Sequence, residues 1–219
     1  MKADASTRIR KVAMAAMLAA IAVVLNYFEM PLPLMPPFLK IDASTIPILI
    51  GSFILGPIYA VGMAFVKNFV HFFTSTSGGV GQIADFIITS AFTATAAIVY
   101  RRNRTKKGAI MACVTGCLSI MVAGYLANRY LLIPFYSQIM PIEAIFSACA
   151  KVNPLIHDLD SYLLFGAMPF NFIKGTLISL VTFPVYKKLS SHIRRFISDF
   201  ERKAAMAEGN SLLDKTGKS

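Results

Sequence analysis

Long stretches with almost no charged residue run through this chain and limit its fold more than any other feature. Residues 12–28 hold 17 consecutive residues without a charge, and a membrane-spanning helix needs about 20 apolar residues. Hydrophobic residues make up 56% of the chain and charged residues 15%, whereas soluble domains average about 45–50% and about 25%. The sequence therefore predicts an all-α membrane protein.

Six apolar segments are expected to form a bundle of six transmembrane helices. Their expected ranges are 8–28, 44–55, 58–74, 80–100, 109–133 and 162–189. Dense prolines make 29–41 a loop, Gly56-Pro57 breaks the chain, and Pro134 is expected to end the fifth helix. Between the fifth and sixth helices, 142–150 is expected to form a short amphipathic helix.

The predicted organisation is one transmembrane domain, 8–190, between a short N-terminal tail, 1–7, and a polar tail, 191–219. The first apolar run is longer than a usual signal-peptide core, so we expect it to be a retained helix.

The net charge of +11 is concentrated in three basic clusters. These are Arg8, Arg10 and Lys11; residues 101–107; and Lys187, Lys188, Arg194 and Arg195. With six spans all three clusters fall on one side, and the positive-inside rule makes that side and both termini cytoplasmic. Basic clusters beside apolar runs argue against nucleic-acid binding, so we expect a multi-pass protein of the cell membrane.

Motifs for chemistry are missing from the sequence. It has no P-loop, no zinc-protease motif and no convincing catalytic pair of carboxylates. Its three cysteines, Cys113, Cys117 and Cys149, form no C-x-x-C pair, and we interpret them as buried apolar residues rather than metal ligands. We predict neither an enzyme nor a cofactor, so energy for transport has to come from a partner or an ion gradient.

Polar residues at membrane depth are costly and indicate function. Asn171 and Lys174 share one face of the sixth helix at i,i+3 spacing, and together they suit a neutral ligand rich in oxygen and nitrogen. The alternative is structural, with Lys174 neutralised by a carboxylate such as Asp85. Pro169, just upstream, is expected to distort the helix and free a carbonyl. On the fifth helix Asn128 is the better inward-facing candidate, whereas Arg129 suits the interface.

A second polar group lies on the third helix, where Lys67 and His71 are spaced i,i+4 beside Asn68. Lys67 either reaches water or pairs with Asp85, and a single histidine on an apolar helix is more often structural. If Lys67, His71 and Asp85 formed a proton relay, the chain would be a stand-alone proton-coupled or facilitative transporter.

Small residues form a stripe on the first helix, with pairs Ala15/Ala19 and Ala16/Ala20. Such spacing allows another helix to approach closely. The approaching helix is either another part of the same bundle or a partner protein.

Four ordered segments stand out as a set. They are LKID (39–42) with Ile46-Pro47, Gly51 and LGP (55–57); KNFVHF (67–72); GVGQIADF (79–86); and MPFNFIKG (168–175). Together they resemble the riboflavin-binding S components of energy-coupling factor (ECF) transporters. The resemblance covers about residues 8–190. Gln82 and Asp85 depart from it, since the family motif has Glu and Asn there.

The resemblance implies a six-helix S-component bundle in a bacterial plasma membrane, with riboflavin as the transported ligand under the first loop. Asn128, Asn171 and Lys174 would then bind the flavin, while a second set would line or cap the pocket. That set is Met35, Leu39, Ile41 and Ala43. The helix-1 stripe Ala15, Ala16, Ala19 and Ala20 would dock onto a transmembrane scaffold (T) subunit coupled to two cytoplasmic ATPases. The S component would topple in the membrane to release the vitamin inward.

Overall fold

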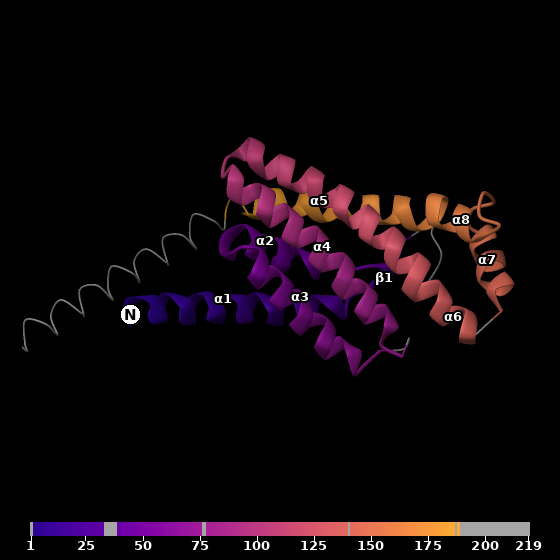
Figure 1. The fold of residues 1–219 in the computed structure, drawn as a ribbon, viewed down its shortest axis with the longest axis horizontal. Coiled ribbons are helices and arrows are strands. Elements are labelled where there is room, and N and C mark those ends of the chain that lie inside the picture. The colour runs from indigo at the N-terminus through magenta and orange to yellow at the C-terminus, as the bar shows by residue number, and fades with distance from the viewer. Residues whose placement is uncertain (1, 33–38, 76–77, 140, 187, 189–219) are drawn as a thin grey trace, which may run out of the picture.

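Helices form nearly all of the structure, a computed structural model that describes residues 2–32, 39–75, 78–139, 141–186 and 188. Figure 1 shows them as a bundle of roughly aligned helices. The elements are α1 (Lys2–Asn26), β1 (Met30–Pro31), β2 (Lys40–Ile41), α2 (Thr45–Leu55), α3 (Pro57–Phe72), α4 (Val80–Arg102), α5 (Lys106–Ala127), the π-helical turn η1 (Asn128–Leu132), α6 (Ile133–Ile139), α7 (Ile142–Ala150), α8 (Leu159–Tyr162) and the π-helical turn η2 (Leu163–Ala167). Beyond η2 the same helix continues to Tyr186.

Four of the helical segments in the described residues are long and apolar enough to cross a membrane. They are Arg8–Asn26, Val80–Arg102, Lys106–Ile139 and Leu159–Tyr186. Each of the six predicted segments is helical over most of its described residues. Of these helices, α2 has 11 residues and α3 has 16. At about 1.5 Å per residue, these two helices are shorter than a hydrocarbon core of about 30 Å.

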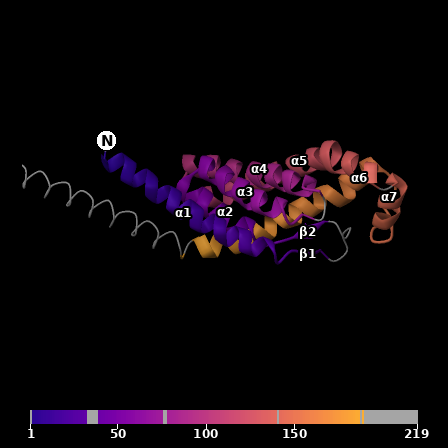
Figure 2. The ribbon, with the colours of Figure 1, turned by 90° about the horizontal axis from the view of Figure 1, so that it is seen from below.

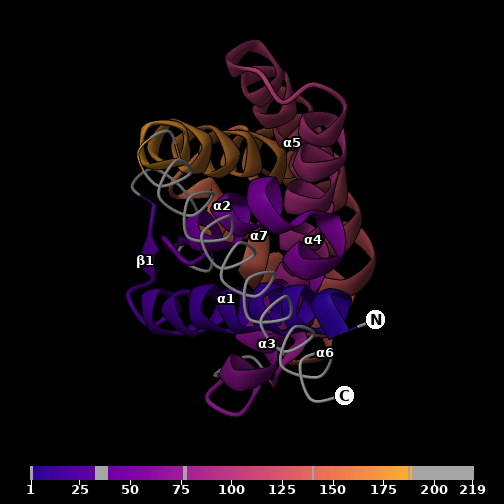
Figure 3. The same ribbon diagram turned by 90° about the vertical axis from the view of Figure 1, so that its left-hand side faces the viewer.

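The short helix α2 lies inside the bundle, in contact with α1, α3 and α4. In the end-on view of Figure 3 it sits in the middle of the assembly. Ile48, Leu49 and Ile50 are almost fully buried. Because protein surrounds the helix, none of its faces has to be polar. Burial by neighbouring helices explains how so short a segment can be so apolar.

The predicted loop 29–41 contains a small antiparallel hairpin. Met30 pairs with Ile41 and Pro31 with Lys40, and an ion pair joins Glu29 to Lys40 at its base. Alternation along β2 puts Lys40 and Ile41 on opposite sides of the hairpin. The hairpin lies in the half of the bundle that carries α6 and α7 (Figure 2).

The prediction that Pro134 ends the fifth helix is wrong, because the helix continues through it to Ile139. Proline lacks the N–H that a helix normally uses at that position. The π-helical turn η1 precedes it, and the N–H of Ile133 donates to Asn128 O, five residues back. A local π turn is a common way for a helix to absorb such a defect.

The last helix repeats this arrangement at Pro169 and begins at Leu159, slightly earlier than predicted. In η2 the N–H of Met168 donates to Leu163 O. The carbonyl of Phe165, which Pro169 deprives of its usual donor, accepts from Asn153 Nδ2 at 3.3 Å. The expected distortion and freed carbonyl are therefore both present.

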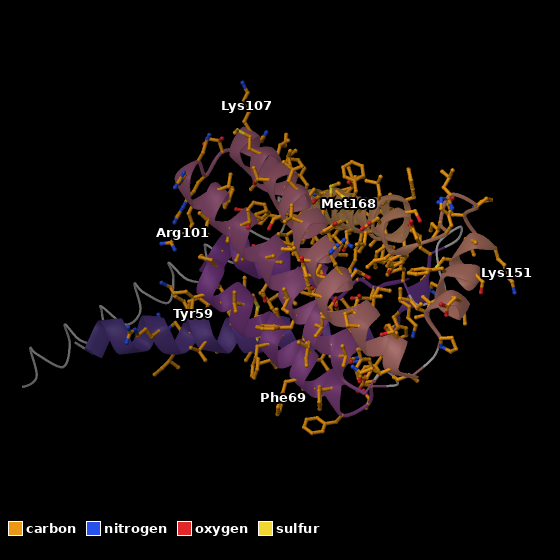
Figure 4. The ribbon with its side chains drawn as sticks, turned by 45° about the vertical axis from the view of Figure 1, so that its right-hand side comes forward. Tyr59, Phe69, Arg101, Lys107, Lys151 and Met168 are labelled. Carbon is orange, nitrogen blue, oxygen red and sulfur yellow. The ribbon has the colours of Figure 1, made fainter. Side chains whose placement is uncertain are left out.

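The basic residues mark one end of the bundle. Figure 4 shows Arg101 and Lys107 at that end and Lys151, beyond α7, at the other. Near the basic end Phe53, Tyr100 and Tyr186 form an aromatic cluster, and the two tyrosine hydroxyls lie 2.6 Å apart. This end is filled by packed side chains, which leaves the other half for a cavity.

Candidate functional site

A cavity of about 250 Å³ lies among the hairpin, α3, α4, the η1–α6 segment and the last helix. Its wall is formed by Asn26, Glu29, Leu39, Lys40, Asp42, Asn68, Gly81, Gln82, Ala84, Asp85, Ile88, Asn128, Leu132, Ile133, Tyr136, Tyr162, Phe170, Asn171 and Lys174. Small-molecule sites usually combine apolar walls with a few convergent polar groups. This cavity has both, and several of its polar groups belong to the membrane helices.

Four of the predicted binding residues meet in this wall: Leu39, Asn128, Asn171 and Lys174. They come from three separate parts of the sequence, the hairpin, η1 and the last helix. Ile41 and Ala43 are not among the lining residues; Ile41 belongs to β2 and Ala43 precedes α2. The predicted residue Met35 lies outside the described residues.

Lys174 is the polar centre of the site. Its side chain is 7% exposed, and Nζ lies 3.2 Å from Asp85 Oδ1 and 3.6 Å from Asp42 Oδ2. The structural alternative named Asp85 as its counter-ion, and that contact is present. Because Lys174 also borders the cavity, its ion pairs and a ligand-binding role are compatible.

Lys67 pairs with the same carboxylate from behind the cavity wall. Its Nζ lies 2.5 Å from Asp85 Oδ2 and 3.1 Å from Ser44 Oγ, and its side chain is fully buried. Ser44 Oγ in turn donates to Asn26 Oδ1. The predicted Lys67–Asp85 pair is thus present, and it anchors Asp85 from the side away from the cavity.

His71 stands apart from this pair. Its ring packs against Tyr27, with centroids 4.4 Å apart, and its Nε2 is buried without a hydrogen-bond partner among the described residues. The three residues of the hypothetical proton relay are therefore not joined into one hydrogen-bonded chain in the described structure.

Three asparagines of the wall share one local geometry. Asn68, Asn128 and Asn171 each donate through Nδ2 to the carbonyl four residues earlier, at 2.8–3.0 Å. This bond fixes each amide plane against its own helix. An amide has two N–H donors and one carbonyl acceptor, so each keeps hydrogen-bonding capacity for a ligand.

Tyr162 fixes one of these amides further, and sequence analysis did not single it out. Its hydroxyl donates to Asn128 Oδ1 at 2.7 Å, and the side chain is fully buried. The bond joins the two proline-associated helices at the level of η1 and η2. Asp42 and Asn68 were likewise not predicted as ligand-facing. Asn68 offered a usable signal, as a polar residue on the apolar third helix, whereas Asp42 offered none.

An apolar groove of about 640 Å³ runs along the outside of α1 and α3. The predicted docking residues Ala15, Ala16, Ala19 and Ala20 line it, opposite Gly62 of α3. The stripe is divided, because Ala19 packs inward against the α2–α3 core while Ala16 and Ala20 are exposed. Small residues on both walls leave room for a partner helix.

Metal binding has no structural support in the part of the chain that is described. No group of three or more His, Cys, Asp or Glu side chains is placed to hold an ion there. Outside the membrane helices, burial raises the pKa of the Cys149 thiol to about 11, so the ligand form of that thiol, the thiolate, is disfavoured at neutral pH.

Comparison with protein families gives a match over most of the chain. A model described as the substrate-specific component of ECF transporters matches residues 10–186. The riboflavin transporter RibU of Staphylococcus aureus (strain TCH60) is 30% identical over 179 residues, which are 82% of this chain and 89% of the relative. The riboflavin transporter FmnP of Bacillus subtilis (strain 168) is 27% identical over 191 residues, 86% and 96% of the two chains.

A solved structure shares the fold. It is described as the S component of a bacterial ECF transporter, and it aligns with a TM-score of 0.68 and 27% identity. The alignment covers 86% of this chain and 99% of that one. The arrangement of helices around the cavity therefore has a counterpart in a known membrane protein.

Proposed function

The chain belongs to the substrate-specific components of ECF transporters, and on that premise we propose that it binds riboflavin in the cavity and passes it inward with partner subunits. The observation that carries this proposal is the convergence of Asn128, Asn171 and Lys174 on one cavity wall. We propose no catalytic step and no cofactor, with riboflavin as transported ligand.

The chemistry of riboflavin suits this wall. One edge of the isoalloxazine ring carries carbonyl oxygens and an imide N–H, which match amide groups and an ammonium donor. Leu39, Ile88 and Phe170 supply apolar surface for the ring faces. The ribityl hydroxyls can both donate and accept, as can Gln82 and Asn68 nearby in the same wall.

Titration of the purified protein with riboflavin tests the proposal. We expect quenching of riboflavin fluorescence with an affinity in the nanomolar range, and a yellow preparation if ligand is retained. Absence of quenching by ligand-free, folded protein would refute riboflavin binding. Mass spectrometry of the extracted ligand would then identify what the cavity holds.

We further propose six membrane crossings with both termini in the cytoplasm. The basic residues Arg101 and Lys107 lie at the end opposite α7 (Figure 4), consistent with a cytoplasmic basic end. In this arrangement 8–190 is the transmembrane domain, 1–7 and 191–219 are cytoplasmic tails, and the short helices α2 and α3 cross beside longer neighbours. The cavity then opens toward the outer face under the hairpin.

The apolar groove on α1 and α3 is the proposed docking surface for a transmembrane scaffold subunit, which would couple to two ATPases. Ala16→Leu and Ala20→Leu are expected to block assembly with the scaffold, because leucine fills space that a partner helix needs. Riboflavin binding by the isolated subunit should persist. Co-purification with the scaffold measures the effect, and complete retention of the complex would contradict it.

Ala13→Leu is the matched control for docking. Ala13 is exposed on the same helix but does not line the groove. We expect this variant to assemble like the wild type.

Tyr162→Phe is expected to weaken riboflavin binding about fivefold, since one neutral hydrogen bond contributes about 1 kcal/mol. The change removes the donor that orients Asn128 but keeps the buried ring. Tyr130→Phe is the control, because Tyr130 lies in η1, the π-helical turn that contains Asn128, and is 70% exposed. Equal riboflavin affinities for the two variants in fluorescence titrations would mean that the Tyr162 hydroxyl does not contribute to binding.

The alternative function, stand-alone proton-coupled or facilitative transport, is not favoured by the family match. Uptake assays in a strain without the coupling ATPases separate the two functions. We expect no concentrative uptake there, whereas robust accumulation would favour the alternative.

A further inference from the structure

Six charged side chains surround the cavity, three acidic and three basic. They are Glu29, Asp42, Asp85, Lys40, Lys67 and Lys174. Each is engaged in at least one ion pair within this set. Ligands entering the cavity therefore meet a site whose formal charges cancel.

Four of these groups form a buried inner set. The side chains of Lys67, Lys174 and Asp42 are 0%, 7% and 8% exposed, and Asp85 is 24% exposed because it borders the cavity. Glu29 and Lys40 are about 40% exposed at the hairpin, where solvent screens them. The inner set therefore dominates the electrostatics of the binding space.

Asp85 is the centre of this inner set, since one carboxylate serves two ammonium groups. Its Oδ2 accepts from Lys67 and its Oδ1 from Lys174. Without Asp85, two buried lysines would share a single carboxylate, Asp42, which lies 3.6 Å from the ammonium of Lys174 and forms no ion pair with Lys67 in the described structure. The neutrality of the inner set thus depends directly on Asp85.

The same contacts limit what Lys174 can offer a ligand. An ammonium has three N–H donors; one is directed to Asp85 and a second faces Asp42. One donor remains, which is enough for a neutral carbonyl or hydroxyl oxygen. A phosphate dianion elsewhere in the cavity finds no unpaired positive charge in this inner set, and its burial is costly unless the charge is paired.

From this geometry we infer that Asp85 makes the cavity selective for uncharged flavins over phosphorylated ones. The inference rests on the proposed function and concerns its specificity. Asp85 has no need to touch the ligand. It acts by cancelling the positive potential of Lys67 and Lys174 and by occupying a donor of Lys174, so that a neutral flavin enters without penalty and an anionic flavin finds no counter-charge.

The test compares two probes, riboflavin and its 5′-phosphate, flavin mononucleotide, on the purified subunit. For each protein the ratio of the two dissociation constants is measured by fluorescence titration at fixed pH and salt. In Asp85→Asn we expect the preference for riboflavin to fall at least about tenfold, equivalent to about 1.4 kcal/mol. The asparagine keeps the shape of the side chain and removes its charge.

Asp42→Asn provides a second variant in case Asp85→Asn does not fold. It also leaves one positive charge in excess and releases a donor of Lys174, so the ratio should shift in the same direction. Asp160→Asn is the matched control: Asp160 pairs with Arg129, is 78% exposed and does not line the cavity. Its ratio should equal that of the wild type.

The outcomes separate the specificity from the function. If the wild type binds riboflavin and a folded Asp85→Asn protein keeps the wild-type ratio within twofold, the inference is overturned while riboflavin binding stands. If Asp85→Asn does not fold, an unchanged ratio in Asp42→Asn overturns it. If the wild type binds neither probe, the proposed function has failed and the specificity falls with it.

Discussion

Lys174→Ala is expected to weaken riboflavin binding at least about tenfold, about 1.4 kcal/mol, without loss of expression. Among the described residues, Lys174 is the only lysine of the cavity wall that comes from the membrane helices, and the substitution removes its ammonium group and the free donor. It also leaves Asp42 without its buried partner and Asp85 with Lys67 alone. Fluorescence titration gives the affinity, and thermal unfolding in detergent gives the stability.

Two further substitutions make this result interpretable. Lys174→Met keeps the apolar stem, so it separates loss of charge from loss of packing. Lys151→Ala removes an exposed lysine near α7 and should leave affinity unchanged. If Lys174→Ala and Lys174→Met bind riboflavin like the wild type but melt at lower temperature, Lys174 is structural and the site needs another donor.

The positions of the helices followed from the sequence because charged residues are rare in membrane-spanning segments, so that long apolar runs stand out. Each of the six predicted segments is helical over most of its described residues. The end at Pro134 was misplaced because a proline breaks a regular helix, whereas here a π-helical turn with its own hydrogen bond absorbs the defect. The predicted range 44–55 already made α2 a short helix. Its position inside the bundle was not predicted, since burial by protein and burial by lipid require the same apolar residues.

The polar part of the site was partly predictable for the same energetic reason. Asn128, Asn171 and Lys174 stood out because polar groups at membrane depth are costly, and the structure brings all three into one wall. The pairing of Asp85 with either lysine was also expected as an alternative. Asp42 and Tyr162 were missed because their roles depend on tertiary contacts with Lys174 and Asn128, which no spacing in the sequence encodes.

Gly124 is a further contributor that sequence analysis missed, since a glycine in an apolar helix carries no chemical signal. Its carbonyl accepts from Asn128 Nδ2 at 2.8 Å. On its other side a Cβ would lie 2.3 Å from Asn171 Nδ2 and 2.6 Å from Asn171 Cγ. Gly124 therefore contacts both binding amides, and the close approach of Asn171 depends on the absent side chain.

Gly124→Ala is expected to weaken riboflavin binding about 30-fold or more, a loss of about 2 kcal/mol. The added methyl cannot coexist with Asn171 in its present position, so the amide must shift. We expect this shift to weaken its bond to the Ala167 carbonyl and to move its free donor and acceptor away from the ligand. Helix propensity alone would act in the opposite direction, because alanine favours a helix over glycine by about 1 kcal/mol. Gly62→Ala is the matched control for binding by the isolated subunit, since a Cβ there meets nothing within 4 Å.

A double substitution decides whether Gly124 acts through Asn171. Once Asn171→Ala has removed the amide, the methyl of Gly124→Ala no longer has that group to displace. The double variant should then bind no worse than Asn171→Ala alone, so the two effects are strongly non-additive. Independent losses that simply add would mean that Gly124 supports the cavity by another contact. Non-additive losses would mean that Gly124 acts through Asn171, because the missing side chain of Gly124 leaves the space that the Asn171 amide occupies.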